Sequence, residues 1–228
     1  PRPSEITGEI INNIAKNVTI NATVVDAETK QPVPNGPVVA KLNGTVIGEG
    51  IVENGTAIIP TNLDKIGNYT IELEYLGNGN YTESNNTVLV EVVGRIANIT
   101  GEPGNTTLGN STVIVNLTDD ETGEPLVNAT VIITLPDGSE VNGTITPDGT
   151  VEVPVDLPVG NYTLPVRYEG NETYNATNTT VDIEILPRPS EITGEVINNT
   201  AKNVTINATV LDAETKQPVP NGPVVAKL

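Results

Sequence analysis

The chain repeats itself, and this property restricts its fold more than any other. Residues 187–228 match residues 1–42 at 39 of 42 positions, at an offset of 186 residues. A weaker repeat lies halfway, at an offset of 93, where NVTINATVVDAET from Asn17 matches NSTVIVNLTDDET from Asn110. Self-similarity at a fixed period is typical of arrays of structural units. The sequence therefore predicts two alternating versions of a unit of about 93 residues.

This period divides the chain into three segments. We name them repeat 1 (residues 1–93), repeat 2 (residues 94–186) and repeat 3 (residues 187–228), the last being a partial copy of repeat 1. A domain that ended at residue 228 would leave strand edges unpaired. We therefore expect either that the polypeptide continues or that another, identical chain supplies the missing strands.

Alternating apolar and polar residues predict β-strands throughout. The expected inward-facing residues of repeat 1 are Val18, Ile20, Ala22, Val24, Tyr69, Ile71, Leu73, Tyr75, Val88, Val90 and Val92, and those of repeat 2 are Val113, Val115, Leu117, Tyr162, Leu164, Val166, Tyr168, Val181, Ile183 and Ile185. A short first strand near Ile6 brings the number to about seven strands for each repeat. No segment has helical periodicity. This pattern predicts an all-β fold of tandem immunoglobulin-like β-sandwich domains.

Turns between the strands are marked by pairs of residues that tolerate positive φ. Asn43-Gly44 and Asn54-Gly55 in repeat 1 correspond to Asp137-Gly138 and Asp148-Gly149 in repeat 2. Both kinds of pair suit the type I′ turn, which needs positive φ at its two central residues. We predict a hairpin of this type at each pair.

The lead-in to Tyr69, Leu…Gly-x-Tyr, resembles a tyrosine corner, in which the tyrosine hydroxyl binds nearby backbone. The cysteine pair and buried tryptophan of antibody domains are absent, because the chain has no Cys and no Trp. We therefore expect a variant of the immunoglobulin fold with an aliphatic core.

The composition excludes several classes of function. Without His or Cys there is no catalytic triad, no thiolate nucleophile and no ordinary zinc, iron–sulfur or haem site. A formal charge of −18 disfavours nucleic-acid binding, and no apolar run is long enough for a membrane span. Glu72 and Glu74 face outward from a strand with no aromatic platform for a sugar substrate. We predict no enzyme activity, no cofactor and no metal.

An acidic turn recurs at the end of the same strand in each repeat: Asp26-Ala-Glu28, Asp119-Asp120-Glu121 and Asp212-Ala-Glu214. A calcium site would need six to eight oxygen ligands, and each turn offers only two or three carboxylates. We favour turns in which Asp binds the local backbone. An internal Lys–Asn isopeptide bond is excluded for repeat 2, since residues 94–186 contain no Lys.

Two of the six tyrosines, Tyr81 and Tyr174, fall in a loop that follows the strand of Tyr75 or Tyr168. They could stack on sugars, as exposed aromatic residues do in glycan-binding proteins. Packing beneath the loop is the interpretation that we favour.

The segments VTINATVVDAETKQPVPNGPV and GNYTIELEYLGNGNYTESNNT resemble the tandem Ig-like repeats of adhesin-like surface proteins of methanogenic archaea. They are more distantly similar to bacterial Ig-like and invasin-type repeats. Repeat 2 follows the pattern closely at ETGEPLVNATV, whereas repeat 1 has Lys30 and Gln31 in place of Gly-Glu. The resemblance covers the whole chain and implies an extracellular, spacer or adhesive role without catalytic residues.

Asn-x-Thr sequons, the acceptors of N-linked glycans, are the strongest chemical signal. Random placement of the same residues would give about four or five, but the chain has twenty. In strands such as residues 17–25, Asn and the Thr two residues on share the solvent face. The predicted sites are Asn17, Asn21, Asn43, Asn54, Asn68, Asn80, Asn85, Asn98, Asn105, Asn110, Asn116, Asn128, Asn142, Asn161, Asn171, Asn175, Asn178, Asn198, Asn203 and Asn207. Covalent N-glycans are therefore expected, although a merely polar surface would also use Asn and Thr.

The leading hypothesis is a structural, glycosylated rod, stalk or filament at the cell surface, whose partners are further repeats of the same polypeptide or identical chains. One alternative is an adhesin whose repeats or distal tip bind a host, cell-wall or partner glycan. Another is a polymer of subunits that complete one another by strand addition.

Overall fold

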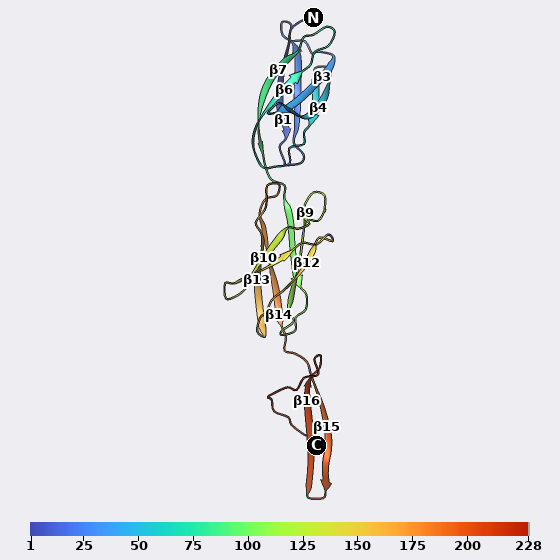
Figure 1. Ribbon diagram of the computed structural model, residues 1–228, viewed down its shortest axis with the longest axis vertical. Coiled ribbons are helices and arrows are strands. Elements are labelled where there is room, and N and C mark those ends of the chain that lie inside the picture. The colour runs from blue at the N-terminus through green and yellow to red at the C-terminus, as the bar shows by residue number, and fades with distance from the viewer. Residues whose placement is uncertain (228) are drawn as a thin grey trace.

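The computed structural model describes residues 1–227; Leu228, the last residue of repeat 3, lies outside the described residues. Every regular element is a β-strand, and the three repeats follow one another along the long axis of the molecule (Figure 1). Among residues 1–227, no helix has the length and hydrophobicity that a membrane crossing requires.

Repeat 1 is a sandwich of seven antiparallel strands. They are β1 (Ser4–Asn12), β2 (Thr19–Asp26), β3 (Asn35–Leu42), β4 (Thr45–Glu53), β5 (Thr56–Pro60), β6 (Gly67–Tyr75) and β7 (Ser84–Val92). Their order is β1-β2-β5-β4-β3-β6-β7, so the β4–β5 hairpin joins the two layers into one continuous sheet.

Repeat 2 has the same strand sequence but two separate sheets. Its strands are β8 (Ala97–Pro103), β9 (Thr112–Asp119), β10 (Thr130–Thr134), β11 (Glu140–Thr144), β12 (Thr150–Pro154), β13 (Gly160–Tyr168) and β14 (Thr177–Ile185). The sheets have the orders β12-β9-β8 and β11-β10-β13-β14. In repeat 3, β15 (Ser190–Thr200) and β16 (Asn203–Asp212) form a two-stranded hairpin.

The alternation in the sequence explains the cores. Ile20, Ala22 and Val24 on β2 are fully buried, as is Val18 just before it, and the inward residues of β9 are equally buried. Each of the two complete repeats has its own cluster of buried residues, one drawn from residues 6–92 and the other from residues 97–185. The prediction of tandem Ig-like β-sandwiches is confirmed.

The tyrosine corner predicted at Tyr69 is confirmed, and repeat 2 has the same corner at Tyr162. The Tyr69 hydroxyl donates a hydrogen bond of 3.0 Å to the Lys65 carbonyl, and the Tyr162 hydroxyl donates one of 3.0 Å to the Pro158 carbonyl. Each bond ties the start of β6 or β13 to the loop before it.

Three local predictions were wrong, one of them the hairpin at Asp148-Gly149, because β11 and β12 lie in different sheets. The first strand is not short, because β1 pairs with β2 over nearly its whole length of nine residues. The Asp-Gly turns are not type I′, since Gly138 (φ 85°) and Gly149 (φ 88°) have positive φ but Asp137 and Asp148 do not.

The proline before each Asp-Gly pair is the reason why these turns are not type I′. Pro136 and Pro147 hold φ near −65° at the first turn position, which favours type I. Gly138 N donates to the Leu135 carbonyl at 2.9 Å, as a type I turn requires. Asn43-Gly44 has no such proline, and both of its residues have positive φ (51° and 80°), as predicted.

Gly101 on β8 occupies a position where the sandwich has no room for a side chain. A Cβ atom there would lie 2.4 Å from Cγ2 of Val181. Replacement of Gly101 by Val is expected to destabilise repeat 2 by about 1–3 kcal/mol through overpacking. Thermal unfolding followed by circular dichroism measures the change, and Gly79→Ala is the control, because a Cβ at Gly79 meets nothing within 4 Å. Equal melting temperatures for the two variants would contradict the packing argument.

Candidate functional site at the junction between repeats

An arginine–aspartate ion pair recurs at the start of every repeat. The pairs are Arg2–Asp26 at 3.3 Å, Arg95–Asp119 at 2.5 Å and Arg188–Asp212 at 2.5 Å. Strand periodicity does not predict these pairs, because the partners are 24 residues apart and the arginines lie outside the alternating strands. Their signal was nevertheless present, since both residue types recur at the offset of 93.

Each of these aspartates also binds its own turn. Asp119 Oδ1 accepts hydrogen bonds from the backbone N–H groups of Glu121 (2.9 Å) and Thr122 (3.0 Å), and Asp26 and Asp212 make the corresponding bonds. The interpretation of the acidic turns as backbone-binding turns is thus confirmed. Within residues 1–227, no group of three or more acidic side chains is placed to hold a metal ion.

The middle pair is the most enclosed, because the end of repeat 1 covers it. The side chains of Arg95 and Asp119 are only 7% and 2% exposed. Arg95 Nη2 donates to Asp119 Oδ1 and to Glu121 Oε2, both at 2.9 Å, and Nη1 donates to the carbonyl of Ala15 in repeat 1 at 3.5 Å. The guanidinium of repeat 2 is therefore shared between its own acidic turn and the preceding repeat.

This arrangement shifts the titration of its members. The Arg95 guanidinium, followed by backbone N–H groups and the Tyr174 hydroxyl, holds the pKa of Asp119 well below its usual range. Burial, together with the hydrogen bond that Tyr174 donates to Asp119 Oδ2 at 2.9 Å, raises the pKa of Tyr174. At neutral pH the cluster is an ionised Arg–Asp pair with a neutral phenol.

A loop of repeat 2, residues 172–175, forms hydrogen bonds and an ion pair with the end of repeat 1. Ile66 N donates to the Glu172 carbonyl at 2.7 Å, and the Thr173 hydroxyl donates to the Asp64 carbonyl at 2.8 Å. Lys65 Nζ pairs with Glu172 Oε2 at 2.6 Å. We name this set the 1–2 joint: Ala15, Lys16 and residues 64–66 of repeat 1, with Gly94, Arg95 and residues 172–175 of repeat 2.

Lys16 adds a contact of another kind to the 1–2 joint. Its Nζ lies 5.4 Å from the centroid of the Tyr174 ring. A cation over an aromatic face at this distance is attracted by the ring quadrupole. The joint thus combines backbone bonds, ion pairs and a cation–π contact, with no free linker between the repeats.

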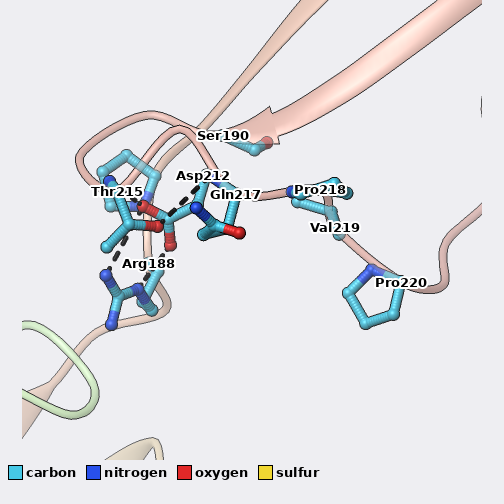
Figure 2. A pocket seen from close by; sticks show the side chains of 9 residues that line it. Arg188, Ser190, Asp212, Thr215, Gln217, Pro218, Val219 and Pro220 are labelled. Carbon is cyan, nitrogen blue, oxygen red and sulfur yellow. Dashed lines mark hydrogen bonds and ion pairs between the residues drawn. The ribbon is translucent and has the colours of Figure 1, made fainter.

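The junction between repeats 2 and 3 keeps only part of this set. Figure 2 shows the Arg188 side chain directed at the Asp212 carboxylate, beside Thr215. The positions of Lys16 and Lys65 are taken by Gly109 and Pro158, which carry no charge. The Arg–Asp pair is therefore common to all repeats, whereas the lysine contacts belong to the 1–2 joint.

The acid sensitivity of repeat 2 follows from Asp119. Its pKa is lower in the folded protein than in the unfolded chain, so its ionisation stabilises the fold fully above about pH 4, the ordinary aspartate value. This contribution is lost as the pH falls through the folded-state pKa, because the proton then binds the unfolded chain first. We expect the melting temperature of repeat 2 to fall below about pH 4, and to fall less in an Asp119→Asn variant.

Calorimetric scans from neutral to acid pH measure this difference. Glu121, Arg95 and Tyr174 face the same carboxylate and remain in both proteins. Parallel acid dependence in the two proteins would show that other carboxylates govern the loss of stability.

The twenty sequon asparagines all lie at the surface. Asn21, Asn116 and Asn198 are half-buried and the other seventeen are exposed. Asn43 and Asn54 sit at hairpin turns, as predicted.

The side-chain amides of the two kinds of asparagine differ in their hydrogen bonding. Asn13, Asn78 and Asn86, which are not the acceptor asparagine of any sequon, donate through Nδ2 to backbone carbonyls at 2.8 to 3.0 Å. Among the sequon asparagines, all of which are described, Nδ2 donates to a protein acceptor only in Asn175. The nitrogen that would carry a glycan is therefore free of protein partners at nineteen of the twenty sites.

The loop tyrosines, Tyr81 and Tyr174, pack against the protein and are not available to stack on a sugar. Tyr81 lies against the core of repeat 1, and Tyr174 lies against the core of repeat 2 with its hydroxyl on Asp119. On β6, Glu74 forms an ion pair with Lys41, and Glu72 is exposed. The interpretation of the tyrosines as packing residues is confirmed.

Together, the fold and the repeated junction define a tandem array of immunoglobulin-like β-sandwiches. Residues 11–93 match the bacterial Ig-like domain (group 3) family. No curated protein matches the chain. The methanogen and archaeal part of the predicted resemblance stays a prediction.

Solved structures that resemble the chain include repeats of an adhesion protein and a domain of a biofilm-associated protein. A tetra-tandem repeat in the extending region of a large adhesion protein is 17% identical, with a TM-score of 0.42, and the match covers 92% of this chain and 56% of that one. Fibronectin(III)-like modules of Clostridium thermocellum CbhA are 18% identical (TM-score 0.29; 79% and 95% covered). The BSP domain of a biofilm-associated protein is 14% identical (TM-score 0.29; 78% and 29% covered). The chain thus spans little more than half the length of the adhesion-protein repeat.

Proposed function

We propose that this chain is a structural segment of a glycosylated rod, stalk or filament on the outside of an archaeal cell. Its role is mechanical. Each sandwich adds length to the rod, and each junction fixes the orientation of one repeat relative to the next. The partners are further repeats of the same polypeptide or identical chains. No catalysis, nucleic acid or metal is involved.

The observation that carries this proposal is the 1–2 joint. The guanidinium of Arg95 is shared by Asp119 and the Ala15 carbonyl, and Ile66 and Thr173 add hydrogen bonds across the boundary. A flexible tether would need none of these contacts, whereas a spacer that must stay extended needs a fixed joint.

The surface supports the glycosylated part of the proposal. At nineteen sequons the side-chain nitrogen of Asn has no protein partner, and none of the twenty asparagines is buried. Bulky hydrated glycans on both faces would cover strand edges and hinder proteases. The chain has no Cys, so it cannot use disulfides for the same protection.

A glycan-binding adhesin is a weaker candidate. Such a protein would present aromatic side chains in its loops, and the loop residues Tyr81 and Tyr174 are partly buried against the cores.

Electron cryo-microscopy of appendages sheared from native cells tests the proposal. We expect a continuous thread with an axial period of two repeats and extra density at the sequon asparagines. Isolated flexible stalks that end in a different globular head would assign the function to that head, and bare asparagines would refute the glycan sheath.

A further inference from the structure

Asn175 differs from every other sequon asparagine in this chain. Its Nδ2 donates a partly buried hydrogen bond of 3.1 Å to the carbonyl of Gly94, the residue that links repeats 1 and 2. Its own backbone is fixed next to the same linker, because Asn175 N donates to the Arg95 carbonyl at 3.0 Å and Arg95 N donates to the Thr173 carbonyl at 2.9 Å. The side chain is thus part of the 1–2 joint.

Asn175 as a whole is exposed, but the side of its amide that carries Oδ1 lies against Gly94. A Cβ atom placed on Gly94 would lie 2.3 Å from Asn175 Oδ1 and 2.9 Å from Cδ1 of Ile66 in repeat 1. In an N-linked glycan the amide is trans, which puts the first sugar carbon on the same side as the carbonyl oxygen. Gly94 lies on that side of Asn175, and Ile66 of repeat 1 lies close to Gly94, so a sugar there would have to displace the segment that joins the two repeats.

Neighbouring sequons lack this conflict. Asn171 uses only Oδ1, which accepts the N–H groups of Thr173 and Tyr174 at 2.8 Å, and its nitrogen remains free. Asn178 on β14 is exposed and makes no side-chain hydrogen bond. In repeat 1 the position of Asn175 is occupied by Thr82, whose hydroxyl is 3.5 Å from the carbonyl of Arg2.

We infer that Asn175 is a joint residue, and that closure of the 1–2 joint and glycosylation of Asn175 exclude each other. The inference about the glycan rests on the proposed function, because it assumes that other sequons are modified. In the assembled array Asn175 is bare while Asn171 and Asn178 carry glycans, and a sugar at Asn175 opens the joint.

Amide hydrogen exchange of the 228-residue chain, made without glycans, tests the joint role. The Ile66 N–H reports the joint because it bonds across the boundary to Glu172, and the Val166 N–H reports the fold of repeat 2. Asn175→Ala should speed exchange at Ile66 about fivefold, the equivalent of one hydrogen bond, without changing Val166. Asn178→Ala is the matched control and should change neither. Unchanged exchange at Ile66 in Asn175→Ala would overturn the joint role.

Steric exclusion is tested by attaching a sugar chemically. Because the chain has no Cys, an Asn175→Cys variant can be alkylated at that one site with an iodoacetamide derivative of N-acetylglucosamine. Relative to the unlabelled variant, exchange at Ile66 should rise on the order of tenfold, and the same label on Asn178→Cys should have no effect. Equal exchange with and without the label at residue 175 would overturn the exclusion.

Glycopeptide mapping of native material completes the test. Glycans on Asn171 and Asn178 with none on Asn175 support the inference, whereas a glycan on Asn175 of assembled material overturns it. A native chain with no glycan on any asparagine refutes the glycosylated rod instead, and the exchange experiments then decide the role of Asn175 by themselves.

Discussion

Replacement of Arg95 by Ala is expected to lower the free energy of unfolding of repeat 2 by about 3–5 kcal/mol, since it leaves the Asp119 carboxylate buried without its cation. The carboxylate is only 2% exposed in the folded protein. The 1–2 joint should loosen at the same time, because Arg95 also binds the Ala15 carbonyl. Chemical denaturation, with amide exchange at residues of β13 as a local probe, measures the loss.

Arg2→Ala is the matched control for this prediction. Arg2 occupies the same position in repeat 1, but its side chain is 66% exposed and its ion pair with Asp26 is longer, at 3.3 Å. The Asp26 carboxylate is as buried as that of Asp119, at 1% exposed, but water can replace the exposed Arg2 guanidinium, so this variant should lose less stability than Arg95→Ala. Equal losses for Arg95→Ala and Arg2→Ala would mean that burial by the preceding repeat has no energetic role.

Leu117→Ala is expected to destabilise repeat 2 by about 2–5 kcal/mol, through lost burial and the cavity left behind. Leu117 is fully buried in the core of repeat 2 and shares no cluster with repeat 1. Residues of repeat 1 such as Leu73 should therefore keep their exchange protection while Val166 in repeat 2 loses its own. This result would establish the predicted boundary near residue 94 in solution.

The control for the core variant is Leu89→Ala, because Leu89 on β7 is 77% exposed. Surface truncations usually change stability by less than about 0.5 kcal/mol. Simultaneous loss of protection in both repeats of Leu117→Ala would contradict independent cores and would favour one cooperative unit.

The strands and their inward faces could be predicted because sandwich strands have one buried face. In β2 and β9 this requirement places an apolar residue at every second position. The apolar positions of the sequence are therefore the buried positions of the strand. The tyrosine corners were predictable for a similar reason, since the Gly-x-Tyr spacing places the hydroxyl near its own loop.

The turn type at the Asp-Gly pairs and the contacts of the 1–2 joint differ in whether the sequence of one repeat can predict them. Pro136 and Pro147 stand directly before the Asp-Gly pairs in the sequence, and a proline at this position indicates a type I turn. The contacts of Arg95 with Ala15 and of Glu172 with Ile66, in contrast, depend on how two folded repeats meet. No periodicity within one repeat encodes that geometry, so only the recurrence of Arg and Asp at the offset of 93 pointed toward it.

The direction of the contact at Arg95 bears on biosynthesis. The Ala15 carbonyl and Lys16 precede Arg95 in the chain, so the surface that receives this guanidinium is complete before repeat 2 leaves the ribosome. Each newly folded repeat can then dock on an upstream neighbour that is already in place. The repeats can therefore fold and dock one after another during synthesis, from the N-terminus onward, before the following repeats are made.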